Sequence, residues 1–119
     1  PNVKEGKGGL RDLQTLYWIA KYIHGVDTAA ALVDEGVFRR EEYEMFAAAE
    51  DFLWAVRCHM HRIAGRAVEK LSFDMQVEVA ARMRYQDTAG RRAVEHFMQD
   101  YFRHATRVGE LTRIVLTAL

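Results

Sequence analysis

Glycines and basic residues gather in one short stretch near the start of the chain, Lys4-Glu5-Gly6-Lys7-Gly8-Gly9-Leu10-Arg11-Asp12. Glycine allows positive φ angles and close approach of the backbone to another surface. A helical pattern begins directly behind it, so amide N–H groups and the positive end of a helix dipole would meet there. The stretch predicts an anion site in which Lys4, Lys7 and Arg11 supply charge and the amides around Gly8 to Leu10 donate hydrogen bonds. The alternative is a flexible lead-in to a helix.

Two common nucleotide motifs do not fit this stretch. The GxxxxGK[ST] phosphate loop needs a Ser or Thr after its lysine, which is lacking here, and no strand pattern precedes the glycines as the dinucleotide fingerprint requires. Asp12 could orient Arg11 or a metal-bound water. A carboxylate in the first turn of a helix is also favourable by itself, so a purely structural role is the alternative.

Other polar clusters give weaker signals. Cys58 and His61 are neighbours on a helix face, but two ligands do not make a zinc site, so no metal site is predicted. His96, Asp100 and His104 follow one another at intervals of four, which predicts a solvated polar stripe.

Arginines and aromatic residues complete the set of candidates. Arg103 and Arg107 could hold a phosphate or pair with acids, and both interpretations stay open. Five aromatic residues fall on or beside apolar stripes and are predicted to be core rather than a base-stacking platform: Trp18, Phe46, Trp54, Tyr101 and Phe102. No nucleophile with its base, and no spaced pair of carboxylates, can be assembled, so no catalytic residue is predicted within the 119 residues.

Composition limits the class of protein. The 17 basic residues balance the 17 acidic ones, which argues against a nucleic-acid partner or an anionic membrane surface. No apolar run is long enough to span a membrane. A single cysteine and no apolar signal segment favour the cytoplasm. The start at Pro1, without a methionine, suggests a fragment of a larger multidomain enzyme.

The elements that would position these residues are helices, because the chain has one proline and many good helix formers. We predict an all-α bundle of about five helices forming one domain over residues 1–119, with a glycine-rich lead-in loop at 1–9 and the bundle at 10–119. The expected helices cover residues 10–24, 28–35, 40–64, 72–83 and about 88 to the end. The third and fifth are long and antiparallel. Expected boundary residues are Thr28, Ser72 and Thr88 as N-caps and Gly25, Gly36 and Gly65 as stops.

With these elements in place, three stretches resemble one enzyme family. Lys4 to Leu13 is similar to the K-x-G-x-G-G-[LI]-R-[DE]-[LI] signature shared by the bacterial PII-protein uridylyltransferase/uridylyl-removing enzymes and by glutamine synthetase adenylyltransferase. Leu71 to Gln76 resembles the "LxFDxQ" segment of the former, and residues 100–111 resemble its "DYFRxxxRVxxL" helix. The similarity covers essentially the whole chain in the right order.

The resemblance implies the helical domain that follows the nucleotidyltransferase domain. Family members transfer UMP from UTP to a tyrosine of the PII nitrogen-signalling protein with Mg²⁺, and remove it at a separate hydrolase domain. The expected partners are thus the nucleotidyltransferase and hydrolase domains of the same chain and PII. The positions carried over as nucleotide or phosphate contacts are Lys4, Gly6, Gly8, Gly9, Arg11 and Asp12.

One departure and two alternatives accompany this resemblance. Lys7 stands where the family often has proline, and the family's catalytic aspartates are absent, so the fragment alone is expected to be inactive and its Mg²⁺ ligands to lie outside it. The alternatives are the corresponding domain of glutamine synthetase adenylyltransferase and a purely structural interaction module.

Overall fold

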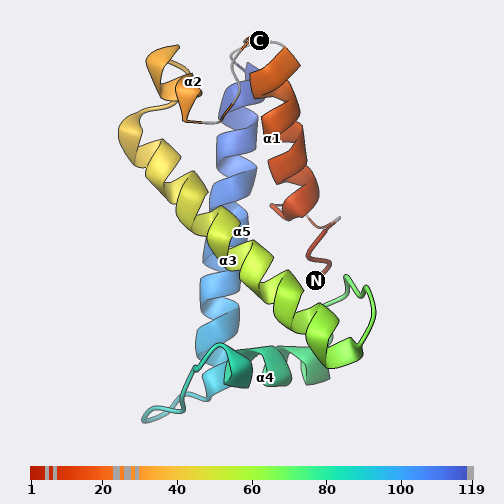
Figure 1. The fold of residues 1–119 in the computed structure, drawn as a ribbon. Helices are drawn as coiled ribbons and strands as arrows, with labels where there is room; N and C mark the ends of the chain where they lie inside the picture. The colour runs from red at the N-terminus through yellow and green to blue at the C-terminus, as the bar shows by residue number, and fades with distance from the viewer. Residues whose placement is uncertain (5, 7, 23–24, 26–27, 29, 118–119) are drawn as a thin grey trace.

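The chain forms five helices in the part that the computed structural model describes, which is residues 1–4, 6, 8–22, 25, 28 and 30–117. They are α1 (Leu10–Tyr22), α2 (Ala31–Asp34), α3 (Arg40–Ala64), α4 (Phe73–Arg82) and α5 (Ala93–Thr117) (Figure 1). Strand-like pairing in these residues is limited to two isolated bridges. The prediction of an all-α bundle of about five helices is confirmed.

The two long helices organise the bundle. α3 and α5 have 25 residues each, which gives a length of about 37 Å. They cross while running in opposite directions, as predicted, and α1 lies beside the C-terminal half of α5 (Figure 1). α4 lies across the other end and packs on both long helices. The Cα atoms span 44 × 33 × 18 Å, so the bundle is a slab about two helices thick.

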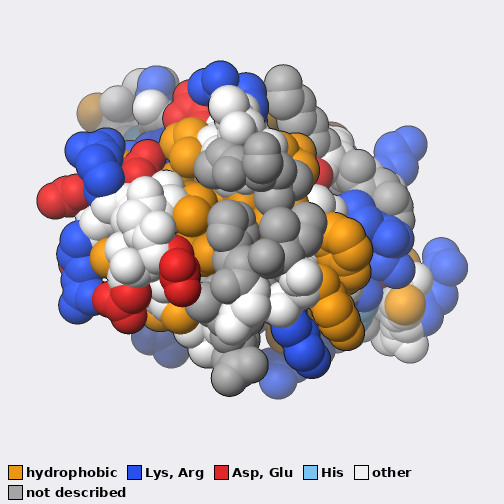
Figure 2. Space-filling model, turned by 90° about the horizontal axis from the view of Figure 1, so that it is seen from above, with side chains coloured by type: hydrophobic (Ala, Val, Ile, Leu, Met, Phe, Trp, Pro, Cys, Tyr) orange, Lys and Arg blue, Asp and Glu red, His pale blue; other side chains and the backbone are white. Residues whose placement is uncertain are grey.

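The surface carries both signs of charge. Seen from the end where α1 and α5 finish, Lys and Arg side chains lie around the periphery, Asp and Glu side chains are mostly in the left half of the view, and hydrophobic side chains lie between them (Figure 2). No helix in the described ranges is long and apolar enough to cross a membrane. Over the whole chain the numbers of acidic and basic residues are equal.

Most predicted helix ends are found at the expected residues. The Ser72 hydroxyl accepts the Met75 amide at the start of α4 (3.4 Å), and Gly65 ends α3 with a φ of 69°. Gly36 has a φ of 76° just after α2. That helix begins at Ala31 rather than near Thr28, although the Thr28 hydroxyl does accept the Ala31 amide (3.3 Å). The predicted stop at Gly25 follows residues 23–24, which lie outside the described ranges.

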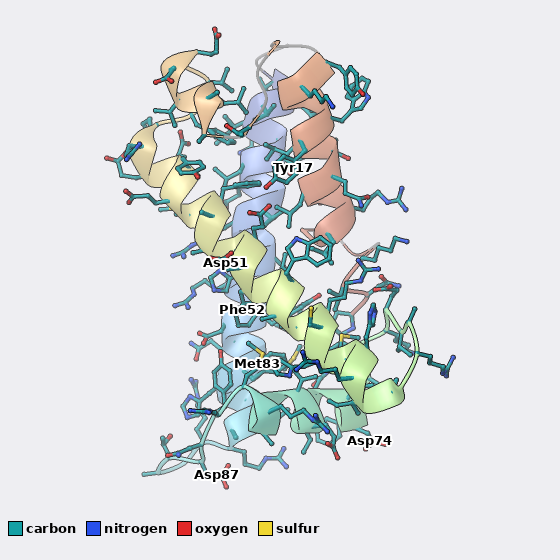
Figure 3. The ribbon with its side chains drawn as sticks, in the orientation of Figure 1. Tyr17, Asp51, Phe52, Asp74, Met83 and Asp87 are labelled. Atoms are coloured by element: carbon teal, nitrogen blue, oxygen red, sulfur yellow. The ribbon has the colours of Figure 1, made fainter. Side chains whose placement is uncertain are left out.

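The start of the last helix differs from the prediction. Thr88 is not its cap, because Thr88 and Arg91 close a tight turn through reciprocal backbone hydrogen bonds of 2.9 and 3.0 Å. α5 begins at Ala93, and the Asp87 carboxylate accepts the Ala93 amide at 2.7 Å. Asp87 lies at this end of the molecule, below the first turn of α5 (Figure 3). The Asp87 carboxylate thus caps the N-terminus of α5 from six residues before it, which is farther than the usual N-cap spacing.

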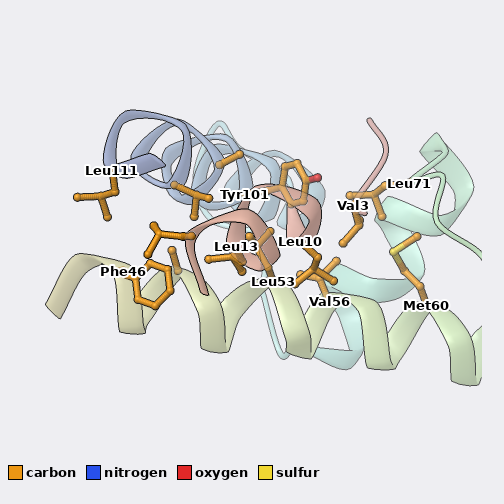
Figure 4. Packing of buried hydrophobic residues seen from close by; sticks show 14 of the residues in the cluster. Val3, Leu10, Leu13, Phe46, Leu53, Val56, Met60, Leu71, Tyr101 and Leu111 are labelled. Carbon is orange, nitrogen blue, oxygen red and sulfur yellow. The ribbon is translucent and has the colours of Figure 1, made fainter. Parts of the chain in front are cut away.

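The core lies where α1, α3 and α5 meet (Figure 4). Each helix contributes a stripe of fully buried apolar side chains, including Leu10, Leu13, Leu16 and Ile19 from α1, Phe46, Leu53, Val56 and Met60 from α3, and Phe97, Val108 and Val115 from α5. Leu71 and Val79 extend the core to the α4 end. This burial is the main stabilising contribution to the fold.

The prediction that five aromatic residues are core is only partly right. Phe46 and Tyr101 are buried, but Trp18, Trp54 and Phe102 are 55%, 43% and 54% exposed. Each of the three stands one position from a buried residue of its helix. One residue is about 100° of helical rotation, so a neighbour of the inward stripe can face solvent.

Candidate functional site

The segment before the glycine loop is built into the fold. The Val3 amide donates to the Glu69 carbonyl (2.8 Å), and the Leu71 amide donates to the Pro1 carbonyl (2.7 Å). Val3 is fully buried in the main core. Residues 1–3 therefore pair with residues 69–71 like a short antiparallel ladder, which fixes the position from which the loop departs.

The backbone amides of the loop already have protein acceptors. The Gly8 amide donates to the Asp12 carboxylate (2.7 Å), the Gly9 amide to the Gly6 carbonyl (2.9 Å) and the Leu10 amide to the Val3 carbonyl (2.8 Å). In this structure these three amides are therefore engaged inside the chain, and the prediction that amides around Gly8 to Leu10 donate to an anion stays a prediction. Asp12 acts here as a cap for the loop.

The glycines are explained by close packing. Gly8 has a φ of 75°, and a Cβ atom there would lie 1.8 Å from the Ala105 carbonyl oxygen of α5. Added Cβ atoms at Gly6 and Gly9 would lie 2.4 Å and 2.5 Å from carbonyl oxygens of the N-terminal segment. The loop is thus pressed between that segment and α5, in a space that admits only backbone.

The backbones of two predicted loop cations, Lys4 and Arg11, lie side by side. The Arg11 amide donates to the Lys4 carbonyl (2.8 Å), so both side chains leave neighbouring backbone positions. Arg11 is exposed on the first turn of α1, and Lys4 is half-buried. Lys7 lies outside the described residues. The assignment of Lys4, Gly6, Gly8, Gly9, Arg11 and Asp12 as phosphate contacts stays a prediction, and its charged part depends on Lys4 and Arg11.

A charge cluster beside the N-terminal segment was not predicted. The Glu69 carboxylate pairs with the Arg57 guanidinium (3.0 Å) and lies 3.6 Å from His61 Nε2. Arg57 also stacks over the Trp54 ring at 5.4 Å. Because Glu69 bonds to Val3 through its backbone, the cluster ties α3 to the segment that carries the loop. Arg57 and His61 fall on positions of the helical repeat of α3, which could have indicated that they pair with an acid. Their partner Glu69 lies beyond the end of the helix, so helical spacing could not identify it.

The predicted polar stripe on α5 is correct for two residues and wrong for the third. Asp100 accepts a hydrogen bond from the Tyr85 hydroxyl (2.7 Å) and pairs with Arg103 (3.1 Å), and His96 contacts Thr88 (2.7 Å). His104 is instead buried, with its ring 4.6 Å from that of Phe52. Burial, and then the nearby Arg103 and Arg107, lower the pKa of His104.

The tyrosines near these clusters are poor acids. Burial raises the pKa of Tyr101 to about 12. Burial and then the hydrogen bond to Asp100 raise the pKa of Tyr85, and burial and then the hydrogen bond to Glu50 raise that of Tyr17. Tyr17 points from α1 toward α3, where Glu50 lies (Figure 3). As neutral donors, the Tyr17 hydroxyl links α1 to α3, and the Tyr85 hydroxyl links the segment after α4 to α5.

Metal ligands are not grouped in the described part of the chain. No set of three or more His, Cys, Asp or Glu side chains there could hold a metal ion. Cys58 is exposed, and His61 faces Glu69. Arg103 pairs with Asp100, as one of the two interpretations of its sequence position proposed.

Comparison with known proteins identifies the family. The model of the GlnD PII-uridylyltransferase family matches residues 1–116. The chain belongs to this family.

Close relatives agree with the family match. Proteins named bifunctional uridylyltransferase/uridylyl-removing enzyme are 68% identical in Cereibacter sphaeroides, 71% in Ruegeria pomeroyi and 59% in Novosphingobium aromaticivorans, each over all 119 residues. The chain spans 13% of the length of these relatives. No solved structure matches it.

Proposed function

We propose that this chain is the helical domain of a cytoplasmic enzyme that transfers UMP from UTP to a tyrosine of the PII protein. The observation that carries the proposal is the match of the family over residues 1–116, with relatives at 68% and 71% identity that are named uridylyltransferases. The domain would pack against the nucleotidyltransferase and hydrolase domains of a longer chain. PII would be the protein substrate.

In this proposal the glycine loop contributes charge rather than amide donors. Lys4 and Arg11 leave adjacent positions of a loop that is fixed by the core, by α5 and by the Asp12 cap. Fixed cations stabilise the charge that develops on transferring phosphoryl groups without reorganisation during the reaction. We propose that the Mg²⁺ ligands lie elsewhere in the longer enzyme, and the lack of a group of three or more His, Cys, Asp or Glu side chains in the described residues supports this.

Replacing Arg11 tests this role. In the full-length enzyme that carries this domain, Arg11→Ala should lower UMP transfer to PII by about tenfold or more, because one charge contact in the transition state is lost. UMP removal should be nearly unchanged, since it is assigned to another domain. Arg82→Ala, at an exposed position of α4, is the matched control. Steady-state transfer and removal rates are the measurements, and unchanged transfer in Arg11→Ala would refute the role.

A second candidate is a structural interaction module in which the loop only makes a tight turn. The engagement of the loop amides and the contact of Gly8 with Ala105 favour it. Under this alternative, Lys4→Ala and Arg11→Ala together would leave transfer unchanged at full thermal stability. The same kinetic series therefore separates the two candidates.

A further inference from the structure

A hollow lies on α5, and one of the residues that line it also contacts the glycine loop. Its volume is about 340 Å³, at the lower end of the range for small-molecule sites. The described residues that line it are Phe102, Ala105, Thr106, Gly109, Glu110 and Arg113. Ala105 belongs to both features, because its carbonyl oxygen is the atom that Gly8 approaches. A ligand in the hollow would therefore be adjacent to the loop.

Phe102 is the aromatic wall of this hollow. The residue is 54% exposed, and its ring meets the ring of buried Tyr101 edge-on at a centroid distance of 5.7 Å. The other residues of the 100–103 stretch have structural partners, since Asp100 binds Tyr85 and Arg103 while Tyr101 is in the core. The neighbours of Phe102 thus have contacts within the fold, whereas Phe102 itself is more than half exposed.

Polar groups around Phe102 complete a set suited to a nucleotide. Arg113 and Glu110 line the hollow, and Arg107 lines a second hollow that shares Phe102, Thr106 and Glu110. Within the described ranges neither Arg107 nor Arg113 has an ion-pair partner, unlike Arg103. An exposed aromatic ring stacks on any base, and cations around it bind phosphate.

We propose that this hollow is the subsite for the base of the nucleotide substrate, with Phe102 as its stacking platform and the Lys4–Arg11 end of the loop toward the phosphates. The inference rests on the proposed function. The small apolar floor of Ala105 and Gly109 lets a flat ring approach α5, and Thr106 and Glu110 offer polar groups to the edges of the base. Phe102 would be a binding residue, not a catalytic one.

The experiment compares substrate dependence in the full-length enzyme. Phe102→Ala should raise the KM for UTP by about tenfold and leave the KM for PII unchanged, because loss of the ring weakens base stacking. Phe102→Trp should keep the wild-type KM for UTP. Phe73→Ala is the matched control, since Phe73 is a phenylalanine of 56% exposure on α4 that does not line the hollow. Thermal melting of each variant establishes that it is folded.

The possible outcomes separate this inference from the proposed function. An unchanged KM for UTP in Phe102→Ala overturns the subsite, as does an increase confined to the KM for PII, which would assign the hollow to the protein substrate. A wild-type enzyme without uridylyl transfer refutes the proposed function. In that case calorimetric titration with UTP still decides the subsite: about tenfold weaker binding by Phe102→Ala supports it, and equal binding or no binding overturns it.

Discussion

At the residue scale, His104 shows how one side chain couples the fold to pH. His104 is only 8% exposed, and its ring packs against that of Phe52. Its Nδ1 atom has no hydrogen-bond partner among the described residues. Burial and the charges of Arg103 and Arg107 lower its pKa, which means that the folded chain binds a proton there less readily than the unfolded chain. Protonation therefore favours unfolding.

The sign of this effect gives a prediction. Stability should be insensitive to His104 well above its unfolded pKa of about 6.5, and should fall as the pH drops below that value, by at most about 1.4 kcal/mol per pH unit. His104→Gln should reduce the loss of unfolding free energy between pH 7.5 and pH 5.5. Urea denaturation of the wild-type and His104→Gln chains at several pH values measures the free energy of unfolding. An equal dependence of that free energy on pH in both chains would contradict the assignment.

At the scale of elements, the contact between the glycine loop and α5 fixes the position of the backbone that carries Lys4 and Arg11. Gly8 lies against the α5 backbone at Ala105, so the loop and the helix that carries Phe102 form one unit. The Glu69 cluster and the Asp12 cap hold the other side of the same loop. A displacement of the loop would move Lys4 and Arg11 together, because their backbones are hydrogen-bonded.

Substitution of Gly8 tests this contact. Gly8→Ala should destabilise the chain by about 2–4 kcal/mol, because it adds a backbone clash to a positive φ. The control is Gly90→Ala, where φ is also positive, at 79°, but an added Cβ would meet nothing within 4 Å. It should cost only about 1 kcal/mol. Chemical denaturation compares the two, and equal losses would show that the loop can move away from α5.

At the scale of the whole molecule, the bundle is thin and exposes large apolar side chains on several helices. These are Tyr17, Trp18, Tyr22, Met45, Trp54, Phe73, Val77, Phe102 and Leu116. Trp18 and Tyr22 form a neighbouring pair on α1 with ring centroids 5.8 Å apart. Contiguous exposed apolar surface marks an interaction site, and the relatives' chains are far longer than this one. The exposed rings are consistent with contacts to other domains.

We predict that the 119-residue chain by itself associates with further copies at high concentration, because the exposed aromatic surface is uncovered. Trp18→Ser should weaken the association, since it removes the larger ring of the α1 pair. Sedimentation velocity over a range of concentrations measures it. A single monomeric species throughout the range would contradict the prediction.

The sequence by itself determined the helices, most of their ends and the family. Helical periodicity and capping chemistry are local, so Ser72, Gly36 and Gly65 could be assigned to helix ends without knowledge of the fold. The three stretches that resemble uridylyltransferases, including the glycine signature, agree with the family match over residues 1–116. Helix ends and sequence signatures depend on residues only a few positions apart in the chain.

Only the tertiary structure decided which groups are available for function. A one-residue step turns a side chain by about 100°, so periodicity could not distinguish buried Tyr101 from exposed Phe102. The acceptors of the loop amides and the approach of Gly8 to Ala105 depend on how the loop folds back and packs on a distant helix. In this structure the glycines of the signature serve close packing and the amides have acceptors inside the chain, so we expect any contact with phosphate to involve the side-chain cations.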